Sequence, residues 1–383
     1  MATLIEITGK ALSGEWGNDD AVGTGIPVLR TTNFTNDGVI NYNNVVTRDI
    51  PKKDLSQKYL QPGDIIIEKS GGSDKQPVGR VVYYDGEPNK FLFNNFTGVL
   101  RVRDRDAWHP RYVFYALYGN YANGGTRRYE NKTTGLHNLK TDQYVQDFAI
   151  QEQTLEYQQQ VVLKLDKVTE LISLRKEQLA KLDQLVKSRF IELFDNKYST
   201  VKIGDVFKTT SGGTPSKAHP EYYEGGTIPW LSSGEVNAGI ISSVKNHITK
   251  AGVDNSSAKM IPENSVVIAM YGATAGQVGL LRVATTTNQA VCSVLPNDSY
   301  VPEYLYYAIK SKKDWMISQC AGGAQPNISQ GIIRQMEIID APRELQQQFS
   351  TFVEHTDKLK LAIQQSLDKL ETLKKSLMQE YFG

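Results

Sequence analysis

Two stretches of the chain, 152–194 and 344–382, have the pattern of long helices with one apolar side. Neither stretch contains glycine or proline, and apolar residues recur every three to four positions among charges of both signs. The first apolar seam runs through Leu165, Val168, Ile172, Arg175, Leu179, Leu182, Val186, Arg189 and Leu193. The second runs through Val353, Ile363, Leu367, Leu370, Leu377 and Tyr381, with polar breaks at Thr356, Lys360 and Lys374. The pattern predicts two coiled-coil helices, each about 60 Å long.

Each predicted helix carries a glutamine triplet near its start, and the rest of the chain also contains an internal sequence repeat. "IPVLRTTNF" (26–34) resembles "IPWLSSGEV" (228–236), and "PRYVFYALYGN" (110–120) matches "PEYLYYAIKSK" (302–312). Such self-similarity favours two similar domains joined by two similar helices. The first helix leaves domain one and the second leaves domain two, so helices that pair along their length must be antiparallel. The alternative is that each helix packs separately on its own domain.

Short β patterns fill the globular part of each half. "DIIIE" (64–68), "FLFNNFTGVLRV" (91–102) and "SVVIAM" (265–270) are rich in β-branched and aromatic residues. One helical stretch follows each set, at 109–120 and 301–317. We expect an α/β (α+β) fold with mixed or antiparallel sheets, in which an antiparallel helix pair separates two similar domains with pseudo-twofold symmetry. The expected boundaries are 1–151 and 197–343 for the two globular domains, and 152–196 and 344–383 for the helices.

Net charge, cysteine content and the length of the apolar runs indicate where the protein is found and which partners it can bind alone. The formal net charge is +1, which disfavours strong nonspecific nucleic-acid binding by the chain alone. Two cysteines without metal-ligand spacing fit a reducing compartment. We find no signal-peptide pattern and no apolar run of transmembrane length, so we expect a soluble, cytoplasmic protein without membrane contact.

A search for catalytic motifs favours a binding module over an enzyme. "SGGTPSK" (211–217) has the wrong spacing for a phosphate-binding loop, and "GATAGQVG" (272–279) is not a dinucleotide fingerprint. The five histidines are scattered and form no pair of metal ligands. The Asn/Asp-Pro-Pro-aromatic motif of amino-methyltransferases does not occur. We therefore predict a non-catalytic chain that binds no cofactor and no metal.

Polar, glycine-rich loops follow the predicted strands at matched places in both halves. Their side chains are of the types that read base edges or neutralise phosphates. In the first half, the residues predicted to bind DNA are Arg30, Thr31, Asn33, Lys69, Ser70, Lys75, Gln76, Arg80, Asn94, Asn95, Arg127, Arg128 and Lys132. In the second half, they are Trp230, Ser232, Ser233, Tyr271, Thr274, Asn288, Gln289 and Gln325.

With these features together, the chain resembles the specificity subunit of Type I restriction–modification systems. The resemblance rests on segments such as "GIPVLRTTNF", "GDIIIEKSGGS" and "GLHNLK", on "VVIAMYGATAGQVG" and "PNISQ", and on the two helices that follow the glutamine triplets. The resemblance covers nearly the whole chain. Its most specific feature is that the segments follow one another in the same order in both halves.

The resemblance implies two target-recognition domains that each read half of a bipartite, asymmetric double-stranded DNA sequence. It also implies that the helices dock two methylation subunits, that two restriction subunits join, and that S-adenosylmethionine, ATP and Mg²⁺ act on those partners. Three alternatives stay open: a specificity subunit of a related, Type IIB-like enzyme, a two-headed structural protein that binds another ligand, and a standalone methyltransferase.

Overall fold

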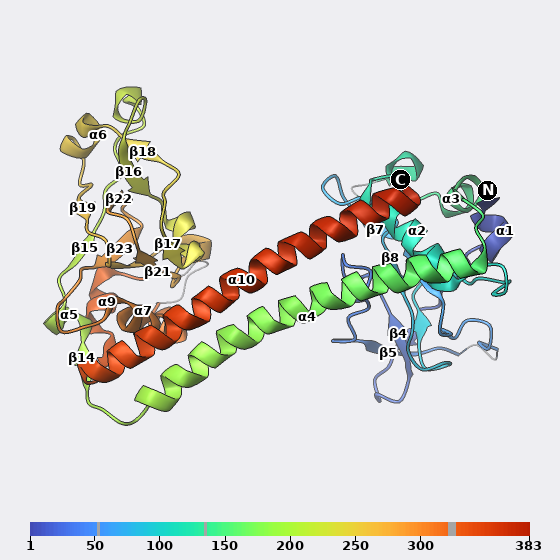
Figure 1. The fold of residues 1–383 in the computed structure, drawn as a ribbon, viewed down its shortest axis with the longest axis horizontal. Helices are drawn as coiled ribbons and strands as arrows, with labels where there is room; N and C mark the ends of the chain where they lie inside the picture. Colours follow the sequence, from blue (N-terminus) through green and yellow to red (C-terminus); the bar gives the residue numbers. More distant parts are fainter. Residues whose placement is uncertain (52–53, 134–135, 321–326) are drawn as a thin grey trace. The chain divides into compact units, whose positions relative to one another are not determined.

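The structure is a computed structural model that describes residues 1–383 except 52–53, 134–135 and 321–326. The chain forms two compact units. Unit 1 comprises Met1–Lys176 and Gln365–Gly383, and unit 2 comprises Glu177–Gln364. Each unit contains one α/β head, called head 1 and head 2 below, and part of each of two long helices (Figure 1).

Head 1 consists of short strands around one buried helix, α2 (Pro110–Ala122). Its other helices are α1 (Leu4–Thr8) and α3 (Thr141–Asp147). Its strands are β1 (Ala2–Thr3), β2 (Leu12–Ser13), β3 (Asn18–Asp19), β4 (Ile26–Leu29), β5 (Val46–Asp49), β6 (Ile65–Glu68), β7 (Ser70–Gly72), β8 (Val81–Tyr83), β9 (Leu92–Phe93), β10 (Thr97–Leu100), β11 (Glu130–Thr133), β12 (Leu136–Leu139) and β13 (Ala149–Ile150).

Two sheets form the core of head 1. One has the strand order β2-β10-β6-β8 and is antiparallel, and the other has the order β3-β5-β4-β9, in which β4 and β9 run parallel. Strand β6 is buried on both faces because Ile65 and Ile67 pack on the side of α2 while Ile66 packs on the opposite side. A strand covered on both faces reads as a continuous apolar run, which accounts for "IIIE". Smaller sheets β11-β12-β7 and β1-β13 complete the head.

Head 2 repeats this order of elements around helix α7 (Pro302–Ser311). Its other helices are α5 (Ile203–Val206), α6 (Lys250–Asp254), α8 (Lys313–Ser318) and α9 (Gln330–Gln335). Its strands are β14 (Thr200–Lys202), β15 (Thr209–Ser211), β16 (Ile228–Leu231), β17 (Ile240–Ile241), β18 (His247–Ile248), β19 (Met260–Ile261), β20 (Val266–Ala269), β21 (Val278–Leu281), β22 (Thr285–Thr287), β23 (Val291–Val294) and β24 (Glu337–Ile339).

The two main sheets of head 2 share their central strands with the two main sheets of head 1. The order β15-β23-β20-β21-β17 contains the counterpart of β2-β10-β6-β8, and β18-β16-β22-β19 contains a parallel pair, β16 and β22, where head 1 has β4 and β9. Strand β20 is again buried on both faces, with Val266 and Ile268 on the α7 side and Val267 on the other. The predicted α/β heads with mixed sheets and a shared plan are confirmed.

The structure subdivides two of the predicted stretches. The run 91–102 forms two strands in different sheets, β9 and β10, because the chain turns at Asn94–Phe96. The helical stretch 301–317 divides into α7 and α8 at Lys312, whose φ of −93° and ψ of 11° are not helical. The Lys312 N–H bonds to Ile309 O three residues back, so a tighter turn ends α7.

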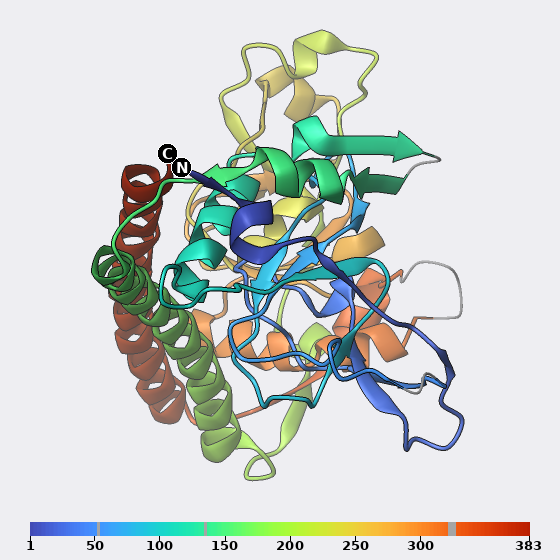
Figure 2. The same ribbon diagram turned by 90° about the vertical axis from the view of Figure 1, so that its right-hand side faces the viewer.

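The two predicted long helices are present as α4 (Leu155–Phe194) and α10 (Arg343–Phe382), each of 40 residues. In unit 1, the start of α4 packs with the end of α10, where Leu377 and Met378 contact the cluster that contains Leu165 (Figures 1 and 2). In unit 2, the end of α4 packs with the start of α10, with the Phe194 and Phe349 ring centroids 5.7 Å apart. Both contacts are antiparallel, as predicted, and the seam residues Leu165, Val186 and Val353 are buried.

The first glutamine of each triplet is a buried clamp between a long helix and the central helix of its head. Gln158 Oε1 accepts the His109 N–H at 2.8 Å, and its Nε2 donates to Ala107 O and Gln153 O, each at 2.9 Å. Gln346 Oε1 accepts the Val301 N–H at 2.9 Å, and its Nε2 donates to Ala341 O at 2.8 Å. His109 and Val301 immediately precede the prolines that begin α2 and α7. The clamps therefore fix the start of α4 on head 1 and the start of α10 on head 2.

Replacing either clamp glutamine by alanine is expected to lower the free energy of unfolding by about 2–4 kcal/mol, because buried N–H and C=O groups lose their partners. Urea denaturation measures the loss, and hydrogen exchange at the first turn of α2 or α7 localises it. The matched controls are Gln159→Ala and Gln347→Ala, because these neighbours are exposed and should change stability by less than about 0.5 kcal/mol. Equal losses in all four variants would rule out a specific clamp.

Candidate nucleic-acid interface

Three strand ends meet on head 1 and bring several predicted residues together. The parallel strands β4 and β9 end side by side, and the Asn94 N–H bonds to Leu29 O at 3.0 Å. The N–H groups of Lys69 and Ser70, just after β6, bond to Phe96 O at 2.8 and 3.2 Å. The segments that follow these ends, 30–36, 68–80 and 94–96, are called the first polar edge below.

Head 2 builds the same edge with different side chains. The Asn288 N–H bonds to Leu231 O at 2.9 Å, as Asn94 does to Leu29 in head 1. The Met270 N–H bonds to Ala290 O at 2.8 Å, as Lys69 does to Phe96. The segments 232–235, 270–277 and 288–290 form the second polar edge. The matched backbone bonds show that the two edges share a scaffold, so they differ mainly in the side chains that they present.

Arg80 holds the first polar edge together from inside. Its Nη2 donates to Glu68 Oε1 at 3.1 Å and to Thr31 O at 3.0 Å, and its Nη1 donates to Phe34 O at 3.0 Å. Glu68 is buried, and burial raises the pKa of its carboxyl while the charge of Arg80 and its hydrogen bonds act in the opposite direction. The geometry gives Arg80 the role of a scaffold rather than of an extended side chain that reaches a ligand.

Asn33 and Asn94 are buried within the same edge. The Asn33 amide accepts from the Arg30 N–H at 3.0 Å and donates to Asn41 O at 2.9 Å, so it shapes the turn after β4. Asn94 fixes the next turn through its backbone, because its carbonyl accepts from Thr97 N and Oγ1 at 3.1 and 2.9 Å. Both residues position their neighbours.

The remaining predicted residues of head 1 differ in exposure. Lys75 and Asn95 are exposed, whereas Arg30, Thr31, Lys69, Ser70 and Gln76 are half-buried. The Gln76 amide donates to Asn36 Oδ1 at 3.1 Å, which ties two loops of the edge together. Arg127 and Arg128 are exposed in the turn before β11, and the Arg128 guanidinium lies 4.8 Å from the centroid of the Tyr129 ring. The side chain of Lys132, in β11, lies outside the described residues.

In head 2, two of the predicted residues are exposed at the edge, namely Tyr271 and Gln289. Other predicted residues are half-buried and build local structure. Ser232 Oγ donates to Glu235 Oε2 at 2.9 Å, Trp230 Nε1 donates to Gly213 O at 3.0 Å, and Asn288 Oδ1 accepts from Ala290 N at 3.2 Å. Ser233 and Thr274 are also half-buried, and Gln325 lies outside the described residues.

One residue of the first polar edge was not predicted from the sequence. Phe96 is 53% exposed, although it follows a strand whose Phe93 is fully buried. An aromatic residue in a β-rich run is normally assigned to the core, so only the turn signal of the preceding Asn94 and Asn95 pointed to its position.

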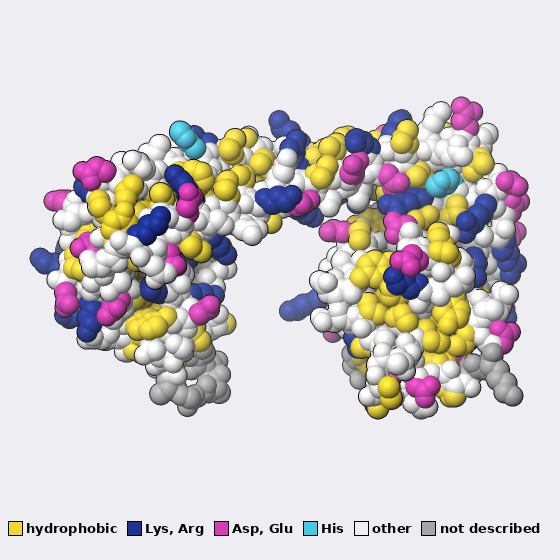
Figure 3. Space-filling model, turned by 90° about the horizontal axis from the view of Figure 1, so that it is seen from below, with side chains coloured by type: hydrophobic (Ala, Val, Ile, Leu, Met, Phe, Trp, Pro, Cys, Tyr) yellow, Lys and Arg dark blue, Asp and Glu magenta, His cyan; other side chains and the backbone are white. Residues whose placement is uncertain are grey.

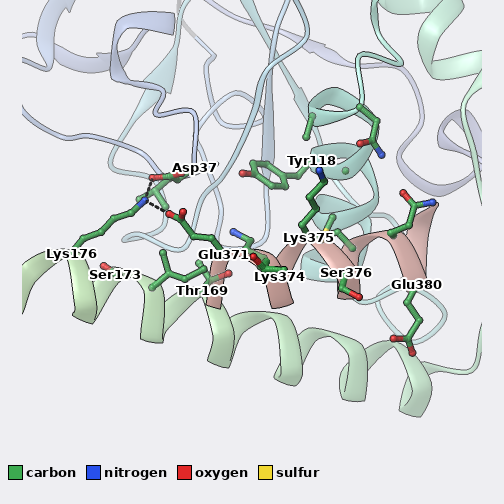
Figure 4. A pocket seen from close by; sticks show the side chains of 18 residues that line it. Asp37, Tyr118, Thr169, Ser173, Lys176, Glu371, Lys374, Lys375, Ser376 and Glu380 are labelled. Carbon is green, nitrogen blue, oxygen red and sulfur yellow. Dashed lines mark ion pairs between the residues drawn. The ribbon is translucent and has the colours of Figure 1, made fainter. Parts of the chain in front are cut away.

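A cavity of about 850 Å³ opens in unit 1 between α2, α4 and α10 (Figure 4). Lys176 Nζ lies 3.6 Å from Asp37 Oδ2 and 3.4 Å from Glu371 Oε1, so it links the head to α10. Lys374 Nζ lies 5.1 Å from the centroid of the Tyr118 ring, and burial lowers its pKa. The residues that line this cavity include none of those predicted to bind DNA.

In the part of the chain that the structure describes, no three His, Cys, Asp or Glu side chains gather closely enough to hold a metal ion. None of the helices described is long and apolar enough to cross a membrane.

Comparison with known proteins assigns the family. Residues 3–184 and 196–374 both match the Type I restriction modification DNA specificity domain, and the chain belongs to this family. It is similar to the Type I restriction enzyme EcoR124I/EcoR124II specificity subunit of Escherichia coli, with 30% identity over 42% of this chain and 41% of the relative. It is also similar to the MjaIX specificity subunit of Methanocaldococcus jannaschii, with 28% identity over 47% of this chain and 43% of the relative. The matches thus span less than half of these curated relatives.

Solved structures share the fold over the whole chain. The S subunit of the Type-I restriction-modification system from M. genitalium has a TM-score of 0.58 and 15% identity, covering 100% of this chain and 95% of that chain. A chain from a structure that describes complex assembly and conformational transition of the type I R-M system has a TM-score of 0.59 and 16% identity, covering 100% and 96%. At this identity the likeness concerns the fold.

The scaffold role of Arg80 predicts a pH-dependent loss of stability in Arg80→Met. Without Arg80, the raised pKa of Glu68 rises further above its value in the unfolded chain. A carboxyl of this kind costs stability as the pH rises through its folded pKa. The variant should be less stable than the wild type by about 3 kcal/mol at pH 7. The deficit should shrink as the pH falls below the folded pKa, which urea midpoints at a series of pH values measure.

The exposed Arg127 supplies the control for this prediction. Arg127→Met removes the same charge from the same head without uncovering a buried carboxyl. Its stability should stay within about 0.5 kcal/mol of the wild type at every pH. A constant deficit for Arg80→Met across the pH range would contradict the assigned role of Glu68.

Proposed function

We propose that this chain is the DNA specificity subunit of a Type I restriction–modification complex, in which each head reads one half of a bipartite, asymmetric DNA target. One observation carries the proposal: the two polar edges are built on the same strand ends but present different side chains. Two edges with the same backbone arrangement and different side chains suit a target whose two half-sites differ in sequence. The doubled family match supports the same reading.

Among the residues predicted to bind DNA, those exposed at the two edges are the base readers in this proposal, namely Lys75 and Asn95 on head 1 and Tyr271 and Gln289 on head 2. Arg127 and Arg128 supply phosphate contacts. On the face that Figure 3 shows, Lys and Arg side chains are interspersed with Asp and Glu. The net charge of +1 favours a complex in which partner subunits add phosphate contacts.

The long helices are proposed to dock two methylation subunits, which two restriction subunits then join. Large apolar side chains remain exposed on both helices outside the buried seam, and such surface favours a protein partner. They are Leu163, Leu174, Leu185 and Ile191 on α4, and Leu359, Leu361 and Leu373 on α10. In this proposal the chain has no catalytic role and binds no cofactor, and the partners use S-adenosylmethionine, ATP and Mg²⁺.

Gln289→Ala tests the assignment of the second polar edge. Because Gln289 is exposed, truncation should leave the fold intact, remove one base contact at a cost of roughly 1–3 kcal/mol, and relax one position of one half-site. Methylome sequencing of cells that express the variant with its partners measures this. Gln347→Ala, an exposed glutamine on α10, is the matched control and should leave the target unchanged. An unchanged target for Gln289→Ala would remove this residue from the interface.

The helices are further proposed to set the spacing between the half-sites. Removing one seven-residue repeat from each of α4 and α10 keeps both seams in phase and shortens each helix by about 10 Å. At 3.4 Å per base pair, the gap between the half-sites should shrink by about three base pairs. Methylome sequencing should show both half-sites unchanged, and insertion of one repeat into each helix should lengthen the gap. A gap of constant length in both variants would refute this role.

A further inference from the structure

Phe96 presents an apolar ring in the middle of the first polar edge. It is 53% exposed, whereas Phe34 and Phe93 of the same head are 5% and 0% exposed. Exposure of one large apolar side chain is common on protein surfaces. Its position is informative here because Asn95 beside it is exposed and Lys69 and Ser70 bond to its carbonyl.

The turn that carries Phe96 is held in place on both sides. Its carbonyl accepts from the N–H groups of Lys69 and Ser70, and the following Thr97 donates to Asn94 O through both N and Oγ1. Asn94 in turn donates to Leu29 O at the end of β4. Because this backbone is already fixed to two neighbouring strand ends, the turn loses little freedom on contact with a ligand, which favours binding.

The residues beside Phe96 in the first polar edge are polar, and one of them, Lys69, carries a positive charge. Lys69 runs alongside β10, where its Cδ lies 3.2 Å from the position that a Cβ on Gly98 would occupy. The missing side chain at Gly98 therefore leaves room for the lysine stem next to the turn. One apolar ring beside hydrogen-bonding side chains is complementary to a ligand surface that is mostly polar and carries one apolar group. In the major groove of DNA, the C5-methyl group of thymine is such a group.

We propose that Phe96 is a specificity-determining residue that contacts a thymine methyl group in the half-site read by head 1. This inference rests on the proposed function. It also predicts a difference between the heads, because the position matching Phe96 in head 2 is Ala290, as the paired backbone bonds from Lys69 and Met270 show. Head 2 instead exposes Tyr271 at the position that matches Ser70.

The test uses the complex of the full chain with its methylation subunits and duplexes of the target that its methylome defines. Each thymine of either half-site is replaced in turn by deoxyuridine, which keeps the hydrogen-bonding groups and lacks the methyl group. At one thymine of the first half-site, the wild-type complex should lose about fourfold in affinity, the effect of one methyl group. Phe96→Ala should bind the natural target more weakly and show no loss at that thymine.

Asn95→Ala is the matched control, because it alters the adjacent exposed residue and should keep the sensitivity to deoxyuridine. Phe96→Leu should keep part of it. Thermal unfolding should be the same for the wild type and the Phe96 variants, since the ring is exposed. Deoxyuridine in the second half-site should affect the wild type and Phe96→Ala equally.

Several results would overturn the inference while leaving the proposed function standing. The first is a half-site for head 1 that contains no thymine. The second is a Phe96→Ala complex that stays as sensitive to deoxyuridine as the wild type. The third is a Phe96→Ala complex that, compared with the wild type, loses the same affinity for the thymine duplex as for the deoxyuridine duplex. A Phe96→Ala chain that no longer assembles with the methylation subunits would assign the ring to a protein contact. A wild-type complex without sequence-specific binding would overturn the proposed function and the inference together.

Discussion

The junction between each head and its long helix depends on one buried glutamine. The side-chain oxygen of Gln158 or Gln346 accepts from the backbone N–H of the residue before the proline that begins α2 or α7. The side-chain NH₂ group of each glutamine donates to a nearby backbone carbonyl. Buried backbone groups need such partners, because water cannot replace them there. The clamp therefore fixes where α4 leaves head 1 and where α10 leaves head 2. From these points, the start of one helix packs with the end of the other in each unit, and the seam residues Leu165, Val186 and Val353 are buried there.

The two polar edges also depend on a small number of backbone contacts. Parallel strand pairs, β4 with β9 and β16 with β22, bring two loops to one edge, and β6 or β20 adds a third. The backbone bonds that join these loops recur in both heads, while the side chains differ. A scaffold that is independent of its readers allows each edge to change its ligand without changing the fold. This is the property that the proposed reading of two unlike half-sites requires.

The parts of this structure set by local pattern were predictable from the sequence. The heptad seams predicted α4 and α10, and apolar runs such as "IIIE" predicted strands, which the structure then buries on both faces. The direction of individual loop side chains was not predictable. Arg80 and Asn33 turn inward because Glu68 and the backbone of another loop bind them, and Phe96 is exposed on a turn that the N–H groups of Lys69 and Ser70 hold. These partners come from other segments of the head, and a single sequence does not show the strand register and turns that bring them together. The break at Lys312 likewise left no glycine or proline signal.

The most direct test of the central claim, that two heads read two half-sites, is methylome sequencing of cells that carry the partner subunits with and without this chain. If the two heads read two half-sites, the chain should add methylated adenines within one bipartite target, made of two unlike half-sites at a fixed separation. Methylation at a single contiguous site, or methylation that is the same without the chain, would contradict it.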